Sequence, residues 1–292
     1  MNSLKPFLKW AGGKRQLLPD IKARLPRSHF ESYVEPFVGG GAAFIDRLSS
    51  GEPNETIIIN DVNSDLIACY KTIKNHPKDL VDALADLQSN YDKAAETQTG
   101  KSEFYYKLRD DFNKRTASDI LQSARLICLN KTGFNGLYRV NKAGAFNVPL
   151  GRYKNPKICD AQNIEALSKA FRDLIILNTD FEKTVDHVVG SAFFYFDPPY
   201  KPLNSSSSFN AYAKSGFNDE AQIRLAKFCH HLDEMGHKWL LSNSDVNTGD
   251  NPSGFFDNLY KGFNIQRVFA SRAINSNRDK RGAIPELLIS NY

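Results

Sequence analysis

The strongest chemical signal in the sequence is the segment Phe193 to Tyr200, which reads FFYFDPPY. Asp197 ends an apolar run, and the two prolines after it restrict the backbone. The Asp197 carboxylate and a rigidly held Pro198 carbonyl can accept both hydrogens of an exocyclic amine, while the Tyr200 ring stacks on the attached base. Accepting those hydrogens makes a nucleobase amine such as adenine N6 a better nucleophile. The sequence therefore predicts a catalytic corner of Asp197, Pro198, Pro199 and Tyr200; the alternative is a plain proline turn after a buried strand.

A second signal pairs a glycine-rich turn with an acidic residue. Residues 35–44, EPFVGGGAAF, lie between an apolar run and a helical pattern, and Gly39 lets the backbone come close to a ligand. Asp61 ends the next apolar run 22 residues after Gly39, the spacing at which a carboxylate accepts hydrogen bonds from a ribose diol. The turn is not GxGxxG, so the pair predicts an adenosine-bearing ligand without a pyrophosphate cradle. Alternatively, Asp61 caps a helix that starts near Asn63.

The N-terminal segment FLKWAGGK, residues 7–14, is not a phosphate-binding loop. That motif needs GxxxxGK followed by Ser or Thr, whereas Lys14 is followed by Arg15 and no strand pattern precedes it. The segment still combines an aromatic ring, a Gly-Gly turn and a cation. Such a set can close over a ligand that carries a carboxylate and an apolar or sulfonium-bearing chain.

The positive charge of the chain is concentrated in two places. The 292 residues include 38 Lys and Arg against 33 Asp and Glu, a formal net charge of +5. Five basic residues and no acidic one lie from Arg139 to Lys157, and four basic residues against one acidic one lie from Arg272 to Arg281. Concentrated positive charge favours a polyanion such as nucleic acid. A solvated loop is the alternative interpretation of either cluster.

Short apolar runs bounded by turn residues predict the strands that must position these groups. Helical patterns at 65–74 and 220–235 alternate with them, which is typical of a doubly wound, mostly parallel α/β sheet. The predicted strands are 32–35, 56–59, 174–177, 192–196, 238–241, 265–269 and 287–289.

Between the strand patterns lies a stretch that we interpret as an inserted, mainly helical domain, residues 76–165. Residues 80–88 and 120–129 are helical in pattern, and a β-hairpin with arms 138–141 and 145–148 has Gly144 at its tip. Residues 1–75 and 166–292 would then form the catalytic domain. The first basic cluster would lie on the hairpin and its continuation.

The spacing of the cysteines and the length of the apolar runs indicate the cellular compartment of the protein. Cys69, Cys128, Cys159 and Cys229 lie far apart without a CxxC motif, so neither a zinc site nor a disulfide framework is predicted. The first residues have no apolar signal core, and no segment approaches the roughly 18 apolar residues that cross a bilayer. We therefore expect a cytoplasmic protein with no membrane partner.

Taken together and in this order, these segments resemble the Dam-type, D12 class (alpha group) DNA adenine N6-methyltransferases, including the modification enzymes of GATC restriction systems. DPPY alone occurs in other amino-methyltransferases, but its combination with the other segments is specific, and the match spans almost the whole chain. The matching segments are FLKWAGGK (7–14), EPFVGGGAAF (35–44), INDVNSDLI (59–67), NGLYR (135–139), FNVPLGRYKNP (146–156), TDFEK (179–183), DPPYKPL (197–203) and LLSN (240–243).

The resemblance implies a Rossmann-like fold and methyl transfer from S-adenosyl-L-methionine to N6 of a flipped adenine in double-stranded DNA, without a metal and with S-adenosyl-L-homocysteine as product. Carried over residue by residue, it implies two sets of binding residues. The cofactor set is Trp10, Lys14, Phe37, Gly39, Asp61, Asp180, Phe181 and Asp197, and the DNA set is Lys9, Arg139, Asn141, Pro149, Arg152 and Lys154.

The recognition sequence is the least determined part of this hypothesis. Some members that read GATC carry Arg near position 143 and an aromatic residue near 140, where this chain has Ala143 and Val140. We expect GATC, a monomer or weak dimer, and a restriction endonuclease encoded with the chain as a candidate partner. The alternatives are a cytosine-N4 or RNA adenine methyltransferase of the same fold, or a catalytically silent nucleic-acid-binding relative.

Overall fold

The structure is a computed structural model that describes residues 4–10, 12, 14, 17–51, 55–97, 99–201, 217–246, 254–271 and 283–292. The chain divides into two compact units, each built from separate segments. Unit 1 comprises Met1–Gly13, Gly39–Pro53 and Asp61–Asn178, and unit 2 comprises Lys14–Val38, Asn54–Asn60 and Thr179–Tyr292. The predicted domain boundaries at residues 76 and 165 remain a prediction.

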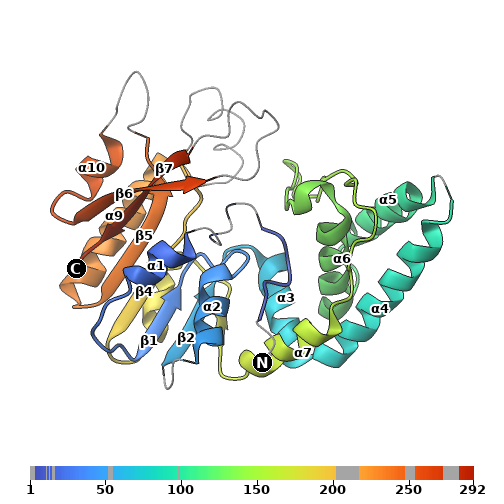
Figure 1. Cartoon of the computed structure of the whole chain (residues 1–292), viewed down its shortest axis with the longest axis horizontal. Coiled ribbons are helices and arrows are strands. Elements are labelled where there is room, and N and C mark those ends of the chain that lie inside the picture. The colour runs from blue at the N-terminus through green and yellow to red at the C-terminus, as the bar shows by residue number, and fades with distance from the viewer. Residues whose placement is uncertain are drawn as a thin grey trace. The chain divides into compact units, whose positions relative to one another are not determined.

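Seven strands form one sheet in the order β3-β2-β1-β4-β5-β7-β6 (Figure 1). Strand β1 is parallel to β2 and β4, and β4 is parallel to β5, whereas β7 runs antiparallel to both β5 and β6. All seven predicted strands are present, and the prediction of a doubly wound, mostly parallel sheet is confirmed. The strands are β1 Ser32–Glu35, β2 Thr56–Asn60, β3 Ile175–Leu177, β4 Ala192–Phe196, β5 Lys238–Ser244, β6 Asn264–Ser271 and β7 Ala283–Ser290.

Strand β4 shows why the predicted run at 192–196 is apolar at every position. The rings of Phe194 and Phe196 stack 5.8 Å apart, and both contact Phe228 of helix α9, Asp219–Glu234. Phe193 points to the opposite face because side chains alternate along a strand, and its ring packs 5.5 Å from that of Phe30. A strand that is buried on both faces has no place for an alternating polar residue.

The other helices of unit 2 are short. They are α1 Leu18–Ala23, the 3-10 helix η3 Phe181–His187 and α10 Phe255–Leu259. The long helix α9 begins at Asn218, whose side chain accepts a hydrogen bond from the Ala221 amide at 3.0 Å. This is the ordinary N-cap role of asparagine.

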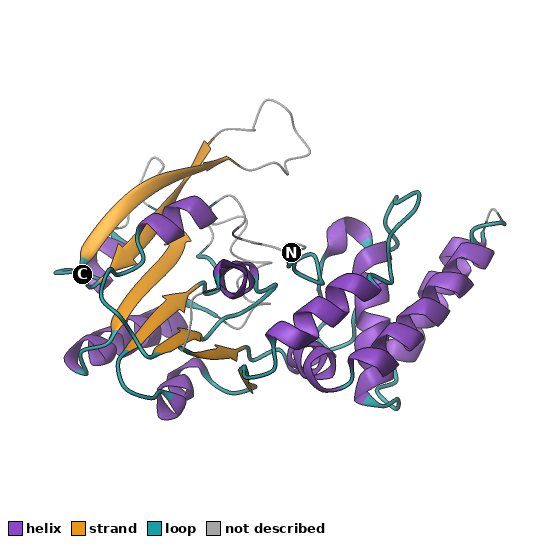
Figure 2. Cartoon of the chain, turned by 60° about the horizontal axis from the view of Figure 1, so that its bottom comes forward, coloured by secondary structure: helices purple, strands orange, loops and turns teal. Residues whose placement is uncertain are grey.

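Unit 1 is mostly helical (Figure 2). The predicted helices at 65–74, 80–88 and 120–129 are present and extend further at both ends. Helix α5 was not predicted, although its buried residues Tyr105, Leu108 and Phe112 lie on one helical face. The elements are α2 Ala42–Ser50, α3 Ser64–Asn75, α4 Pro77–Ala94, α5 Gly100–Asn113, α6 Asp119–Thr132, η2 Phe134–Gly136 and α7 Ala161–Ala170.

The predicted hairpin, residues 138–148, is present in unit 1. Val140 and Phe146 form an isolated antiparallel bridge, and the Asn141 amide donates to the Ala145 carbonyl at 2.9 Å. Gly144 lies at the tip with φ of +76°, a conformation that favours glycine. The Asn147 amide also donates to the Arg139 carbonyl at 3.0 Å, so backbone hydrogen bonds join the arms on both sides of the bridge.

No helix in the described part of the chain is both long and apolar enough to cross a membrane.

Asn60, at the end of β2, provides a test of how the strand ends of unit 2 are tied together. Its buried amide donates to the carbonyls of Pro36 and Thr179, both at 3.0 Å, and accepts from the Thr179 amide at 2.9 Å. Because Asn60→Ala leaves buried backbone groups unpaired, we expect it to lower the free energy of unfolding in urea by about 2–4 kcal/mol. Asn75→Ala, at an exposed position, should change it by less than about 0.5 kcal/mol. Equal effects of the two substitutions would contradict this account.

Candidate active site and nucleic-acid interface

The predicted catalytic corner lies in unit 2, where β4 ends. The Lys14 ammonium is 2.9 Å from Oδ1 of Asp197, and the same nitrogen lies 4.0 Å from the centroid of the Tyr200 ring. The Lys14 side chain is only 7% exposed, whereas that of Asp197 is 25% exposed. A cationic nitrogen therefore contacts both groups that the sequence assigns to a substrate amine, beside a carboxylate that solvent can reach.

Side chains from other elements hold this corner in place. Ser242 of β5 lies with Oγ 3.3 Å from Oδ1 of Asp197. The Tyr200 hydroxyl donates to Glu286 of β7 at 2.7 Å, and the Gln222 amide of α9 donates to the Pro199 carbonyl at 3.1 Å. Sequence reasoning assigned no role to Ser242, Gln222 or Glu286. Only the LLSN segment, which contains Ser242, carried a signal.

Burial and the neighbouring charges have opposite effects on the pKa of Asp197. Burial raises the pKa of Asp197 above the ordinary aspartate value, the Lys14 charge and hydrogen bond lower it, and the negative charge of Glu286 raises it. Lys14 thus favours the ionised carboxylate against desolvation. Burial, followed by the charges of Asp197 and Glu286, raises the pKa of Tyr200 well above its ordinary value. The phenol therefore stays protonated and can donate to Glu286.

An aromatic cluster beside a carboxylate forms around Phe181, also in unit 2. The rings of Phe37 and Phe181 lie 5.3 Å apart, and Phe217 meets Phe37 edge-on at 5.4 Å. Arg224 forms an ion pair with Asp180, and its guanidinium lies 4.5 Å from the Phe181 ring centroid. Phe181 and Phe217 are buried, so the rings of this cluster pack on one another beside the Asp180–Arg224 ion pair.

In unit 1, Asp61 and Gly39 contact each other directly, although 22 positions separate them. Oδ2 of Asp61 accepts a hydrogen bond from the Gly39 amide at 3.1 Å, and Oδ1 accepts one from the Asn63 amide at 2.9 Å. The cap of α3 is Asn63, which accepts from the Leu66 amide. Burial raises the pKa of Asp61, and these two amide hydrogen bonds oppose the rise.

Trp10 lies against the glycine-rich turn of the same unit. A Cβ atom at Gly39 would stand 3.0 Å from Cδ1 of the indole, and one at Gly40 would stand 2.8 Å from the Trp10 Cβ. Gly39 also has φ of +48°. The turn therefore requires glycine because the tryptophan occupies the space beside it. Trp10, Gly39 and Asp61 are brought together as one group.

The predicted DNA residues all belong to unit 1. Asn130 of α6 fixes the backbone of Lys9 through two hydrogen bonds, and the Lys9 ammonium lies 3.8 Å from the centroid of the Tyr153 ring. The Arg139 guanidinium donates to the side chain and the carbonyl of Asn147 at 2.7 and 2.9 Å. Asn141 builds the hairpin turn, because its side-chain oxygen accepts from the amides of residues 143 and 145 at 3.0 Å.

The segment after the hairpin continues the basic surface. Arg152 and Lys154 are exposed, and the Pro149 carbonyl accepts from the Phe134 amide at 2.8 Å. Lys131, which sequence reasoning missed, lies in the last turn of α6 just before the NGLYR segment. Burial lowers its pKa, and the like charge of Lys9 lowers it further. The second basic cluster, Arg272 to Arg281, lies outside the described residues.

Among the described residues, no group of three or more His, Cys, Asp or Glu side chains could hold a metal ion. The four cysteines are unpaired, and burial raises the pKa of Cys69 and of Cys128 to about 12, far from the range of a reactive thiolate.

Three relatives resemble the chain along nearly its whole length. The Type II methyltransferase M.MjaIII of Methanocaldococcus jannaschii is 50% identical over 99% of both chains. The Type II methyltransferase M1.LlaDCHI of Lactococcus lactis subsp. cremoris is 39% identical over 99% of this chain and 96% of its own. The DNA adenine methylase of Escherichia coli K12 is 34% identical over 99% of this chain and 95% of its own.

The family model for D12 class N6 adenine-specific DNA methyltransferases matches residues 10–274, which include the catalytic corner, the glycine-rich turn and the hairpin. The chain therefore belongs to the D12 class of N6 adenine-specific DNA methyltransferases and is an adenine-specific DNA methyltransferase.

Proposed function

We propose that the enzyme transfers a methyl group from S-adenosyl-L-methionine to N6 of an adenine that has left the double helix, within GATC. The observation that carries this proposal is the contact of one ammonium with both Asp197 and the Tyr200 ring. This contact supports a site in which an N–H group donates a hydrogen bond to the Asp197 carboxylate while the attached base stacks on the Tyr200 ring. An adenine N6 in the same place would donate to Asp197.

The chain's own residues would prepare and align the amine. The adenine must flip because its N6 is paired inside the duplex, which costs a few kcal/mol. When bound, S-adenosyl-L-methionine supplies the electrophilic methyl group of its sulfonium. Asp197 would accept a hydrogen bond from N6, which directs the nitrogen lone pair toward the methyl carbon. The N–C bond would form as the S–C bond breaks with its electron pair on sulfur, and the surplus N6 proton would pass to water, directly or through Asp197. Alignment of this kind can contribute several kcal/mol.

Donor binding is assigned to the residues that the family resemblance implies. Each oxygen of Asp61 already accepts one amide hydrogen bond and keeps a second lone pair, which suits a ribose hydroxyl. The indole of Trp10 offers a face for an apolar or cationic chain. The proposed donor residues are Trp10, Lys14, Phe37, Gly39, Asp61, Asp180, Phe181 and Asp197.

The DNA partner is assigned to the hairpin and its basic continuation. Lys9, Arg139, Asn141, Pro149, Arg152 and Lys154 would hold the duplex through phosphates and base edges. Because two relatives are named Type II methyltransferases, we propose that a cognate restriction endonuclease accompanies the enzyme. The enzyme would act on cytoplasmic DNA as a monomer or weak dimer.

The first test combines product analysis with Asp197→Ala. Purified enzyme with labelled S-adenosyl-L-methionine should convert duplex DNA to N6-methyladenine, identified by mass spectrometry of nucleosides, and sequencing should place the mark in GATC. Asp197→Ala should lower the transfer rate by at least about a hundredfold while S-adenosyl-L-homocysteine still binds. N4-methylcytosine as product, or transfer to RNA alone, would favour the alternatives. Unmodified nucleic acid would refute the proposal.

The second test concerns the ribose contact of Asp61. We expect Asp61→Ala to weaken the binding of S-adenosyl-L-homocysteine by about 1–3 kcal/mol in calorimetry, since it removes a charged hydrogen bond. Asp110→Ala, which removes an exposed carboxylate from α5, serves as the control and should leave the dissociation constant unchanged. An unchanged constant for Asp61→Ala would reject the assignment.

The third test concerns the basic surface. Replacing Arg152 and Lys154 with Ala should reduce the slope of log affinity for duplex DNA against log salt concentration by roughly 0.9 for each phosphate that is no longer neutralised. The control is the double substitution of Lys71 and Lys78, which are exposed on α3 and α4. If the control reduces the slope as much, or if the test pair leaves it unaltered, the DNA binds elsewhere.

A further inference from the structure

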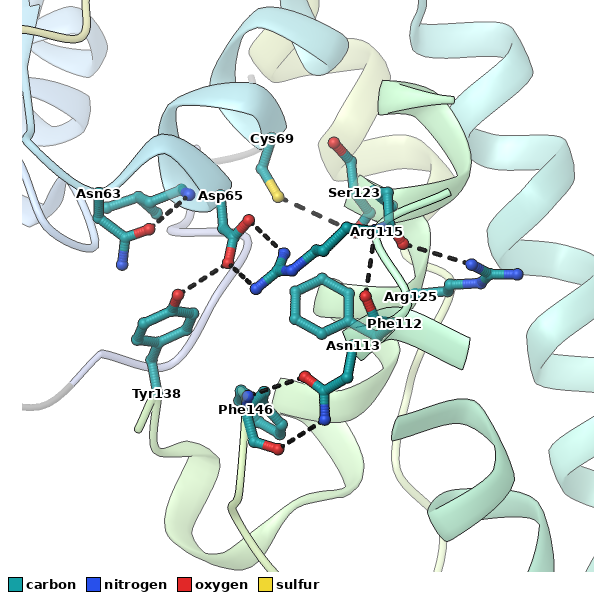
Figure 3. Close-up of polar contacts among 12 residues, drawn as sticks. Asn63, Asp65, Cys69, Phe112, Asn113, Arg115, Ser123, Arg125, Tyr138 and Phe146 are labelled. Carbon is teal, nitrogen blue, oxygen red and sulfur yellow. Dashed lines mark hydrogen bonds and ion pairs between the residues drawn. The ribbon is translucent and has the colours of Figure 1, made fainter. Parts of the chain in front are cut away.

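A polar network in unit 1, centred on Asp65, joins three elements (Figure 3). Asp65 lies in the first turn of α3. The two terminal nitrogens of Arg115 contact its two carboxylate oxygens at 2.5 and 2.9 Å. The Tyr138 hydroxyl donates to Oδ2 of the same carboxylate at 2.7 Å. One acidic side chain thus binds both the segment after α5 and the first arm of the hairpin.

Arg115 adopts a conformation that needs an explanation. Its φ is +56°, in the left-handed region that is unfavourable for a residue with a Cβ atom. Its guanidinium packs 4.2 Å from the ring centroid of Phe112 while it pairs with Asp65. The two side chains are 37% and 19% exposed, and ion pairs this close to solvent add little stability. We therefore look for the role of the Arg115–Asp65 pair in the position that it gives to Asp65 and, through Asp65, to the Tyr138 hydroxyl.

Tyr138 connects this network to the glycine-rich turn. Its ring stacks on that of Trp10, with centroids 5.5 Å apart and planes 25° apart. Trp10 lies against Gly39 and Gly40, and Gly39 is bonded to Asp61. A continuous chain of contacts therefore connects Asp61, the residue proposed to bind the ribose, with Tyr138 of the hairpin.

The phenol is well suited to act as a fixed donor. Burial, and then the negative charge of Asp65, raises the pKa of Tyr138 above its ordinary value. The hydroxyl hence keeps its proton and donates to the carboxylate. The next residue in the chain is Arg139, the first proposed DNA contact of the hairpin.

The same end of α5 also holds the second arm of the hairpin. The Asn113 amide donates to the Phe146 carbonyl at 3.0 Å, and its oxygen accepts from the Phe146 amide at 2.8 Å. The Phe146 ring lies 5.8 Å from Phe112 and 5.9 Å from Tyr138. These contacts join the hairpin to the end of α5, in addition to the hydrogen bonds between its own two arms.

We propose that Asp65 and Arg115 are positioning residues for Tyr138, and that Tyr138 couples methyl-donor binding beside Trp10 to DNA binding by the hairpin. This inference rests on the proposed function and adds the residues that link its two ligands. Two ligands that favour the same placement of Tyr138 bind cooperatively, and the coupling is reciprocal. A Tyr138 without its hydrogen bond would transmit neither ligand's preference to the other.

The test measures coupling with S-adenosyl-L-homocysteine and a GATC duplex. In the wild type, each ligand should lower the dissociation constant of the other by roughly fivefold or more. Tyr138→Phe keeps the ring but loses the hydroxyl, and Asp65→Ala loses the acceptor. Both should bring the ratio close to one. The KM values for donor and DNA should rise, whereas kcat with both ligands saturating should stay within about twofold, because neither residue touches the reacting atoms.

The fluorescence of Trp10 tests the coupling directly, because a purely structural role of Tyr138 would not make the Trp10 emission respond to DNA. The chain has two tryptophans, so Trp239→Phe leaves Trp10 as the reporter. Adding the DNA duplex should change the Trp10 emission in this background. The change should be absent when Tyr138→Phe or Asp65→Ala is added.

Matched controls separate coupling from damage. Tyr106→Phe removes an exposed hydroxyl from α5, and Lys114→Ala removes the neighbouring ion pair with Asp111. Both should leave the coupling ratio as in the wild type. If Tyr138→Phe or Asp65→Ala melts early, Arg115→Gly serves instead, because glycine suits the left-handed backbone while the guanidinium is removed.

The outcomes distinguish this inference from the proposed function. A wild type that methylates DNA but shows a ratio of one, or a ratio that survives Tyr138→Phe and Arg115→Gly, overturns the coupling and leaves the proposed function intact. A wild type that transfers no methyl group to DNA refutes the proposed function, and the coupling fails with it.

Discussion

A partly exposed carboxylate at the end of a fully buried strand, whose pKa desolvation raises, is the constraint on which unit 2 depends. Strand β4 carries Asp197 to its place, and desolvation there disfavours the charged form. The Lys14 ammonium at 2.9 Å opposes that effect. Ser242 orients the carboxylate from β5, and Glu286 orients the neighbouring Tyr200 from β7. The sheet order places β5 directly beside β4, and this neighbour position brings Ser242 to Asp197.

The sequence predicts features that depend on a local pattern, and it does not predict contacts between residues that are distant in the chain. The seven strands were readable because each contains a short apolar run bounded by turn residues, which in β4 covers every position. Asp197 and Tyr200 were readable because their motif is contiguous. Ser242, Gln222 and Glu286 were not readable, since each reaches the corner from a distant segment. The antiparallel direction of β7 carries no signature of its own in composition. Helix α5, in contrast, was readable from its buried face and was missed because charged residues surround that face.

The hairpin shows that residues assigned to recognition also have structural tasks. Asn141 was expected to contact DNA, yet its side-chain oxygen already accepts two amide hydrogen bonds within the turn. Arg139 likewise donates to Asn147 across the arms. An alanine at either position would alter the shape of the hairpin together with any contact to DNA. Arg152 and Lys154 lie beyond the arms and are exposed, so their replacement reports on charge more directly.

The glycine-rich turn supports the proposed methyl donor over a ligand with a pyrophosphate. In a dinucleotide-binding turn, glycines make room for a pyrophosphate. Here, Gly39 and Gly40 make room for the indole of Trp10 instead. An aromatic face in this position attracts a cation, whereas a phosphate would need backbone amides and basic side chains. The amide of Gly39 is already bonded to Asp61. The turn thus supports the proposed donor, S-adenosyl-L-methionine, which joins a ribose to a sulfonium and carries no phosphate.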